Sequence, residues 1–259
     1  MHKSLCTIAL AVNKHFNFYH NNTLGVTMSF QAAISLSDQI AQHIAAQIIT
    51  GELVEGERIQ ELRIAKELDV SRGSVREALL ILERTRLIDI FPRRGAIVTE
   101  MSAQQVQCLF DTSIMVMSVV VQRTSERWRQ NDNDQMNTLM QELHEQVKLG
   151  DIEKFYDLVF IFLQNCHAIV DNPYLKTIYE NLLPALRRSY FLTLNTSKRE
   201  LQEAFVLFGH VIDAILIRKG EQAALFMEDF CRHLRHLVLD SLARMKQIEL
   251  AWAQRSRRS

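Results

Sequence analysis

Four arginines in one short stretch of the chain have the residue type and the spacing to bind DNA. Arg72 and Arg76 lie one helical turn apart in the segment "SRGSVREALLIL", and Arg93 and Arg94 precede Gly95 in "PRRG". The planar guanidinium group donates paired hydrogen bonds to guanine edges and to phosphate oxygens. Arginines at the start of a helix and at the tip of a hairpin are therefore typical of a protein that binds double-stranded DNA.

Two serines extend this set. Ser71 stands where it can cap the helix that begins at Arg72, so that the free backbone N–H groups of the first turn can hold a phosphate. Ser74 can add a hydroxyl contact, and Gly95 allows the tight turn of the hairpin. The predicted DNA-binding residues are therefore Ser71, Arg72, Ser74, Arg76, Arg93, Arg94 and Gly95.

The total charge of the chain argues neither for nor against nucleic acid as a partner. Lys+Arg 30 and Asp+Glu 30 give a formal net charge of +0, so a DNA-binding surface must come from a local concentration of charge. Between residues 70 and 95, six arginines stand against only Glu77, Glu83 and Asp89. The arginine-containing stretch is therefore the basic patch that the neutral total conceals.

Two helices are predicted before this stretch. The first starts near Ser35 or Ser37, either of which can cap it, and ends at Gly51. Its apolar residues recur at helical spacing and are Ile40, Ile44 and Ile48. The second is shorter, from about residue 59 to residue 68. We expect it to bury Leu62, Ala65 and Leu68.

A third helix and a hairpin contain the arginines. The helix runs from Arg72 to about Arg86, and its apolar face is formed by Val75, Leu79 and Leu82. The segments "LIDIF" and "AIVTE" are rich in β-branched residues and flank a turn at residues 92–95, which predicts two antiparallel strands. Three helices followed by a hairpin make a winged helix-turn-helix.

Everything after "TEMSAQQ" is expected to be helical. Long amphipathic stretches are separated by breaks at "GD" (Gly150), "DNP" (Asp171) and "KG" (Lys219). These stretches cover residues 103–129, 133–148, 152–170, 172–194, 198–218 and 221 to the end. The fold class is therefore mainly α, with an N-terminal winged helix-turn-helix domain followed by an all-α helical bundle.

The composition fits a globular protein with few loops. Of 259 residues, 47% are hydrophobic, with Gly 8 and Pro 3. The four cysteines are far apart, which predicts buried thiols in a reducing cytoplasm instead of a disulfide framework. No apolar run approaches the ~18 residues that span a bilayer, so no membrane contact is expected.

The domain boundaries follow from these elements. Residues 1–29 are expected to be a disordered or mis-started extension, with Met28 as an alternative start. Residues 30–100 form the predicted DNA-binding domain and residues 101–247 the helical domain. Residues 248–259 are expected to form a basic tail that ends in "QRSRRS".

The segment "ELRIAKELDVSRGSVREALLILERTRLIDIFPRRGAIV" resembles the DNA-binding domain of GntR-family transcription regulators. It shares their leucine-alanine helix, the valine-serine-arginine turn, the valine-arginine-glutamate-alanine-leucine helix and the arginine-glycine wing, over about Ser35 to Glu100. The helical remainder, with "DNPYL" and "VIDAILIRKGEQAA", is similar to the effector-binding, FCD-type domain of the FadR subfamily. The resemblance implies a homodimer on a palindromic DNA operator, and a small-molecule effector in the bundle that alters the spacing of the two reading heads.

Many members of that subfamily hold a metal in the bundle through an aspartate and three histidines, and contact a carboxylate effector through an arginine. The corresponding positions in this chain are Ser113 and Met117 on the first bundle helix, and Val159, Leu163, Phe208 and Cys231 or His233 on later helices. These residues do not supply the converging oxygen and nitrogen ligands that a borderline metal needs. The residues at these positions therefore predict neither a metal nor another cofactor here.

An apolar lining at these positions favours an apolar or acyl-type effector. It cannot compensate the desolvation of a carboxylate, but it can accept a chain or a ring. Met115, Met117 and Phe208 suit such a guest because methionine adapts to irregular shapes. A small polar metabolite held elsewhere and the absence of any ligand are the alternatives, since aliphatic residues at helical spacing are also typical of an ordinary core.

Histidines offer a different metal set. His167, one turn beyond Leu163, could combine with His210 and His233, although histidines on three helices are more often core or surface residues. We include His167 in the predicted effector pocket and predict no metal.

Two other classes of function are weighed against DNA binding. An enzyme is not expected, because the chain has no G-x-S-x-G, no Gly-rich phosphate loop and no H-E-x-x-H. Glu153 and Asp157 lie one turn apart, which is more typical of a solvated helix face than of an acid/base pair. The other alternative is a helical protein-interaction module with a vestigial DNA-binding head, against which the intact Arg72, Arg76 and Arg93 argue.

Overall fold

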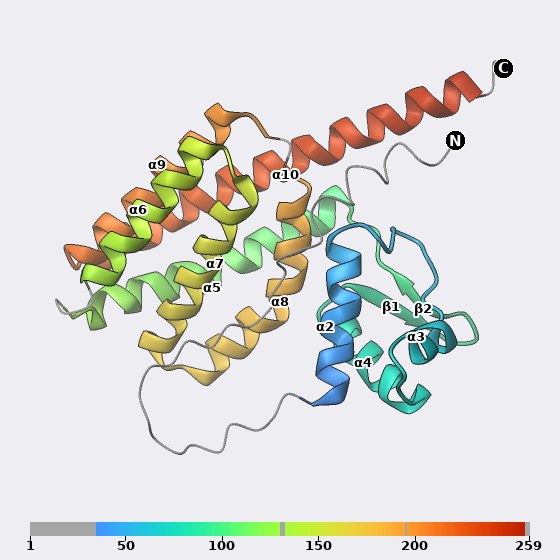
Figure 1. The fold of residues 1–259 in the computed structure, drawn as a ribbon. Coiled ribbons are helices and arrows are strands. Elements are labelled where there is room, and N and C mark those ends of the chain that lie inside the picture. The colour runs from blue at the N-terminus through green and yellow to red at the C-terminus, as the bar shows by residue number, and fades with distance from the viewer. Residues whose placement is uncertain (1–34, 130–132, 195, 257–259) are drawn as a thin grey trace. The chain divides into compact units, whose positions relative to one another are not determined.

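A computed structural model describes residues 35–129, 133–194 and 196–256, in two compact units that divide after Glu100 (Figure 1). The predicted extension at residues 1–29 and the last three residues of the predicted tail lie outside the described residues. The first unit holds α2 to α4 and a two-stranded sheet, and the second holds α5 to α10. The mainly α fold class is confirmed.

The first unit is built around the packing of α4 (Arg72–Arg84) against α2 (Leu36–Ile49). α2 begins after Ser35, whose Oγ accepts a hydrogen bond from the Asp38 backbone N–H at 3.1 Å. The apolar residues that the helical spacing predicts are all buried in one core, namely Ile40, Ile44 and Ile48 from α2 and Val75, Leu79 and Leu82 from α4.

The short helix α3 (Glu61–Glu67) buries a different residue from the one that the sequence predicts. Leu62 is 64% exposed, whereas Ile64 and Ala65 are buried and Leu68 is half-buried. Residues two apart lie on nearly opposite sides of a helix, so Ile64 and Leu62 cannot both face the core. The expectation that Leu62 is buried was therefore wrong.

The hairpin forms as predicted. β1 (Ile88–Phe91) pairs antiparallel with β2 (Gly95–Val98), with Ile88 opposite Val98 and Phe91 opposite Gly95. Residues 57–59 run along the other edge of β2, where the Ile59 backbone N–H donates to the Ala96 carbonyl at 2.9 Å. The wing therefore has a third, short strand-like segment that precedes α3.

Six helices make up the described part of the second unit, and each matches a predicted stretch. They are α5 (Ala103–Arg127), α6 (Asn133–Leu149), α7 (Ile152–Val170), α8 (Pro173–Phe191), α9 (Lys198–Leu216) and α10 (Gly220–Ser256). Two of the predicted breaks adopt left-handed backbone, with φ of 72° at Gly150 and 46° at Asp171. A left-handed residue ends a helix because it reverses the handedness of the backbone.

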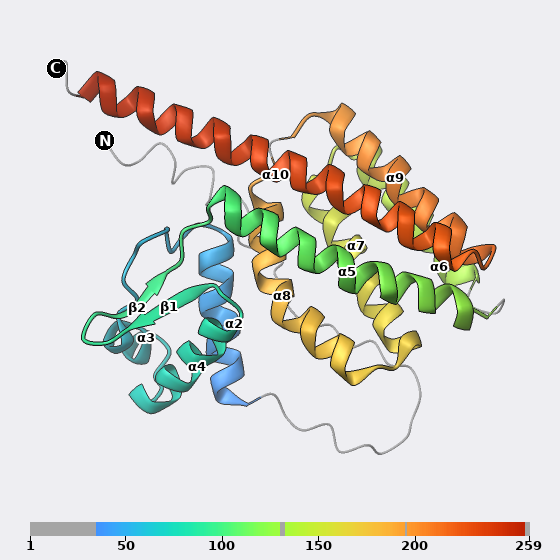
Figure 2. The ribbon, with the colours of Figure 1, turned by 180° about the vertical axis from the view of Figure 1, so that it is seen from behind.

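α5 is the central helix of this bundle. α10 packs along it, and α7, α8 and α9 also contact it (Figure 2). Among the described residues, α5 is the one helix that is long and apolar enough to cross a membrane. Its side chains Val106, Phe110 and Val120 are buried in the bundle, which is typical of the core helix of a globular domain.

The start of α10 lies very close to α5, and this generates a stability prediction. A methyl group at Gly220 would lie 2.9 Å from Ser125 Oγ and 3.2 Å from the Gln122 carbonyl oxygen. Gly220→Ala should therefore destabilise the protein by about 1–3 kcal/mol, because the backbone of α5 must move. Chemical denaturation measures this change.

Gly209, inside α9, is the matched control. A methyl group there would meet only the flexible end of Met140, at 3.5 Å. Gly209→Ala should stabilise by about 0.5–1 kcal/mol through the better helix propensity of alanine. Equal effects of the two substitutions would contradict the close approach at Gly220.

Candidate nucleic-acid interface and effector domain

The first turn of α4 is capped from its own sequence. Ser71 Oγ accepts a hydrogen bond from the Ser74 backbone N–H at 3.0 Å and lies 2.9 Å from Ser74 Oγ. This bond fixes the start of the helix while both hydroxyls stay at the surface. The predicted role of Ser71 as the helix cap is therefore confirmed.

Arg72 and Arg76 lie exposed one turn apart at the start of α4, and a single carboxylate contacts both. Arg76 Nε donates to Glu61 Oε2 at 2.9 Å, and Arg72 Nη2 lies 3.7 Å from the same oxygen. An exposed ion pair of this kind stabilises a fold by only about 0–1 kcal/mol. Its main consequence is geometric, because the Arg76 bond uses the Nε–H and leaves the terminal nitrogens for a base edge.

Glu61 is a residue that sequence reasoning missed. It precedes Arg72 by 11 positions and Arg76 by 15, on a different helix, so no helical spacing rule connects them. The motif of a helix-turn-helix places α3 beside α4, and only that tertiary contact brings the carboxylate to the arginines. A second carboxylate, Glu77, accepts a hydrogen bond from Ser37 Oγ at 2.6 Å and ties α4 to α2.

The tip of the wing presents Arg93 and Arg94 to solvent. The turn closes through a hydrogen bond from the Arg94 backbone N–H to the Phe91 carbonyl at 3.2 Å. Arg93 has a left-handed φ of 66° and Gly95 has 79°, so the predicted need for glycine at position 95 agrees with its backbone. The structure thus places the predicted DNA-binding set at two places, the start of α4 and the tip of the hairpin. The four arginines and Ser71 are exposed there, and Ser74 and Gly95 are half-buried.

The predicted effector-pocket residues lie in the bundle, and most are part of its packed core. Ser113 is buried, and its Oγ donates to the Leu109 carbonyl at 2.7 Å within the same helix. Val159 and Leu163 are buried on α7. Met115, predicted beside Met117 in the lining, is instead 64% exposed, because residues two apart on α5 face opposite ways.

Sulfur and aromatic groups fill the centre of the bundle. Cys231 Sγ lies 3.9 Å from Met117 Sδ and 3.8 Å from Met227 Sδ. Phe208 packs edge-on to Phe162 with ring centroids 5.1 Å apart, and its ring lies 5.0 Å from that of Phe230. Met117, Phe208 and Cys231 are therefore packed among other sulfur and aromatic side chains.

The histidines of the alternative metal set do not converge. His167 is buried and stacks on Tyr179 of α8 with centroids 4.6 Å apart, whereas His210 packs near Phe226 and His233 Nδ1 lies 4.0 Å from Glu203 Oε1. Within the described part of the chain, no three His, Cys, Asp or Glu side chains come together. Burial, with a smaller contribution from Lys176, lowers the pKa of His167 to about 4, so its imidazole is neutral at physiological pH.

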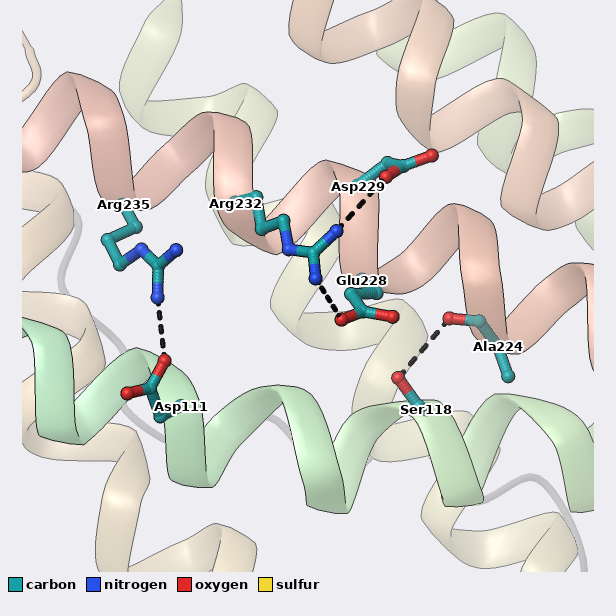
Figure 3. A network of polar contacts seen from close by, with 7 residues as sticks. All are labelled: Asp111, Ser118, Ala224, Glu228, Asp229, Arg232 and Arg235. Atoms are coloured by element: carbon teal, nitrogen blue, oxygen red, sulfur yellow. Dashed lines mark hydrogen bonds and ion pairs between the residues drawn. The ribbon is translucent and has the colours of Figure 1, made fainter.

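A polar pocket lies at the surface between α5 and α10, away from the predicted set. Its lining residues are Gln107, Asp111, Arg232, Arg235, His236 and Leu239. Figure 3 shows that Arg235 reaches from α10 to Asp111 of α5, and their ion pair measures 2.6 Å. Arg232 turns instead to Glu228 of its own helix, also at 2.6 Å. Both arginines are therefore paired with carboxylates, and the Arg235–Asp111 pair links the two helices.

Comparison with known families agrees with the two units. The description "Bacterial regulatory proteins, gntR family" matches residues 36–98, and the FCD domain matches residues 109–236. The chain belongs to the GntR family. It is therefore a GntR-type transcriptional regulator with a helix-turn-helix DNA-binding domain and an FCD effector domain, as the resemblance in the sequence implies.

Two relatives of this GntR regulator align with most of the chain. The gluconate operon transcriptional repressor of Bacillus subtilis is 24% identical over 187 residues, which are 71% of this chain and 76% of that protein. The transcriptional regulator McbR of Escherichia coli is 22% identical over 220 residues, covering 83% and 94%.

A solved structure of E. coli McbR/YncC superposes with a TM-score of 0.69 at 19% identity, over 81% of this chain and 100% of that one. A putative GntR regulator from Rhodococcus sp. RHA1 gives a TM-score of 0.61, also at 19% identity, over 79% and 97%. At this level of identity the solved structures support the fold alone.

The shared carboxylate predicts a role for Glu61 in base discrimination. Glu61→Gln removes a negative charge beside the DNA and replaces the ion pairs with, at most, a weaker neutral hydrogen bond, so both arginines are held less firmly. Binding to random DNA should therefore strengthen, while the ratio of specific to random binding should fall about tenfold, or about 1.4 kcal/mol. Fluorescence anisotropy with an operator and a scrambled duplex measures both affinities.

Glu67→Gln is the control. Glu67 is exposed on the same helix as Glu61, and its substitution removes the same charge. It should raise the two affinities by similar factors. A specificity ratio that stays at the wild-type value in Glu61→Gln would show that the carboxylate does not position the arginines.

Proposed function

We propose that this GntR regulator binds a palindromic operator as a homodimer in the cytoplasm, and that a small apolar or acyl-type molecule in its FCD domain changes its affinity for DNA. The joint exposure of Arg72 and Arg76 at the capped start of α4 is the observation that carries the DNA-binding part. In a helix-turn-helix, this turn of the second helix enters the major groove.

Each exposed group has a distinct part in the proposed complex. Arg72 and Arg76 contact base edges, and Ser71 and Ser74 place their hydroxyls at the helix start next to a phosphate. Arg93 and Arg94 contact the sugar-phosphate backbone or the adjacent minor groove from the wing. The proposed activity involves binding only, with no reaction catalysed and no metal or other cofactor.

The proposed effector site is the centre of the bundle, around Met117, Val159, Leu163, Phe208 and Cys231. These side chains are apolar and tightly packed, so a guest must move some of them to enter. Met117 is suited to this because its unbranched side chain changes rotamer at low cost. A carboxylate-rich guest is disfavoured, since the core offers its charge no compensating partner.

The proposed dimer buries one exposed stripe of α5. Met115 and Val119 are one turn apart on this helix and are 64% and 37% exposed. Large apolar side chains in one stripe of a helix surface are typical of an interface. Dimerisation also doubles the specific contacts, because one small reading head covers only half of a palindrome.

The two groups of arginines should differ in their effect on specificity. With an operator selected from random DNA, Arg76→Ala should cost about 1–3 kcal/mol of specific binding and relax the base preference. Arg94→Ala should weaken binding to all sequences more evenly. Unchanged operator affinity and base preference in Arg76→Ala would mean that α4 is not the recognition helix.

The proposed interface predicts the response to a buried charge. Val119→Glu should convert the dimer to monomer, because an unpaired carboxylate is costly to desolvate in an interface. Val206→Glu on α9, where the side chain is 46% exposed, should leave the dimer intact. Native mass spectrometry of the gently purified proteins measures both masses.

The same mass spectra test the proposed class of effector, because they show which molecule is bound to the dimer. A dimer that carries an acyl or other apolar molecule supports the proposed site, and a metal-loaded dimer would contradict it. A wild-type protein that remains monomeric at micromolar concentration would contradict the proposed dimer without affecting DNA binding by each head.

A further inference from the structure

Arg58 is a basic residue of the DNA-binding domain. Neither the helix-turn-helix motif nor the wing motif includes it. It lies in the segment of residues 57–59, which runs along the edge of β2 that does not pair with β1. This segment comes before α3, more than 30 positions ahead of the wing tip in sequence. Its placement at the wing is therefore a consequence of the tertiary fold.

The strand pairing fixes the direction of the Arg58 side chain. Ile59 is buried, and so are Ala96 and Val98 of β2, whereas Gly95 and Ile97 are only half-buried. Side chains alternate along a strand, so Arg58, which bridges to Ile97, belongs to the outer face of the sheet. There it is exposed to solvent.

The guanidinium group of Arg58 lies over Gly95. A methyl group at Gly95 would be 3.6 Å from Arg58 Nε and 3.7 Å from its Nη2. These are ordinary van der Waals distances, so the Arg58 side chain lies against Gly95 at this end of the hairpin. Gly95 directly follows Arg93 and Arg94, so Arg58 lies at the same end of the hairpin as these two residues.

The charge of Arg58 is not neutralised by the described part of the protein. Ion pairs engage Arg72 and Arg76, but no carboxylate among the described residues lies within 4.0 Å of Arg58. The adjacent Glu57 is occupied, since its Oε2 accepts a hydrogen bond from the Val54 backbone N–H at 3.1 Å. An exposed cation that lies against Gly95, the residue after Arg93 and Arg94, and that has no carboxylate partner among the described residues fits an anionic ligand.

We propose that Arg58 is the third basic contact of the wing and binds a phosphate of the DNA backbone beside the groove that Arg93 and Arg94 approach. This inference rests on DNA binding through the wing and adds a residue to it. A phosphate contact carries no base preference, so Arg58 contributes affinity and register instead of sequence selection.

The salt dependence of binding tests this assignment. Arg58→Met keeps an unbranched chain over Gly95 but removes the charge. It should reduce the magnitude of the negative slope of log K against log salt concentration by about 0.9. It should also weaken binding to operator and random DNA by the same factor. Arg58→Lys should keep the wild-type slope. Arg199→Met, which removes an exposed arginine from α9, is the control for net charge and should leave both quantities unchanged.

A purely structural role predicts the opposite pattern, in which Arg58→Met keeps the wild-type slope. That result would overturn the proposal, whereas failure of the wild type to bind any DNA would overturn the DNA-binding function itself. If circular dichroism shows that Arg58→Met does not fold, operators with single methylphosphonate substitutions supply the test. When the substituted phosphate is the one that Arg58 contacts, the slope of log K against log salt concentration for the wild type should fall in magnitude by about 0.9. If no phosphate beside the wing has this effect, the proposal is overturned.

Discussion

The DNA-binding domain depends on the burial of one side of α4 while the start of this helix stays open to solvent. Val75, Leu79 and Leu82 are buried against α2, and burial of each such side chain contributes about 1.5–3 kcal/mol. Rotation of the helix about its axis would expose these residues and force Arg76 toward the core, where an unpaired charge is costly. The apolar face therefore fixes the direction in which the arginines point, and specificity for DNA is built on hydrophobic packing.

Around that helix, polar contacts set finer details. Ser71 fixes where the helix starts, Glu77 ties it to α2 through Ser37, and Glu83 Oε1 accepts the Ile90 backbone N–H at 3.2 Å. The last bond joins α4 to the first strand of the wing, so the two DNA-facing elements are connected by one short path. None of these bonds is worth more than about 1–2 kcal/mol, but each removes a freedom of orientation.

The sequence was sufficient for the elements and their order, because hydrophobic period, capping serines and the "PRRG" turn are local signals. The sequence pattern predicted the wrong residue where two apolar residues of one helix compete for the buried face. Leu62 and Met115 both fit a helical spacing, yet both are exposed, since their neighbours Ile64 and Met117 take the core positions. The contacts of Glu61 with the arginines and of Arg58 with Gly95 join separate segments, and such pairs exist only once the chain has folded. The predicted effector set was located in the bundle core, but a sequence pattern cannot distinguish a lined cavity from a filled one.

The buried cysteine thiols of the bundle make its rate of opening measurable. Burial raises the pKa of both Cys166 and Cys231 to about 12, so their thiols are protonated and shielded, whereas Cys108 on the surface of α5 is accessible. A thiol reagent modifies the thiolate, and a buried thiol must first reach solvent. The rate at which an alkylating reagent modifies Cys231 thus reports how often the helices around Met117 separate, and Cys108 provides the reference rate in the same molecule. A guest that wedges these helices apart would accelerate that rate, and one that fills the space between them would slow it.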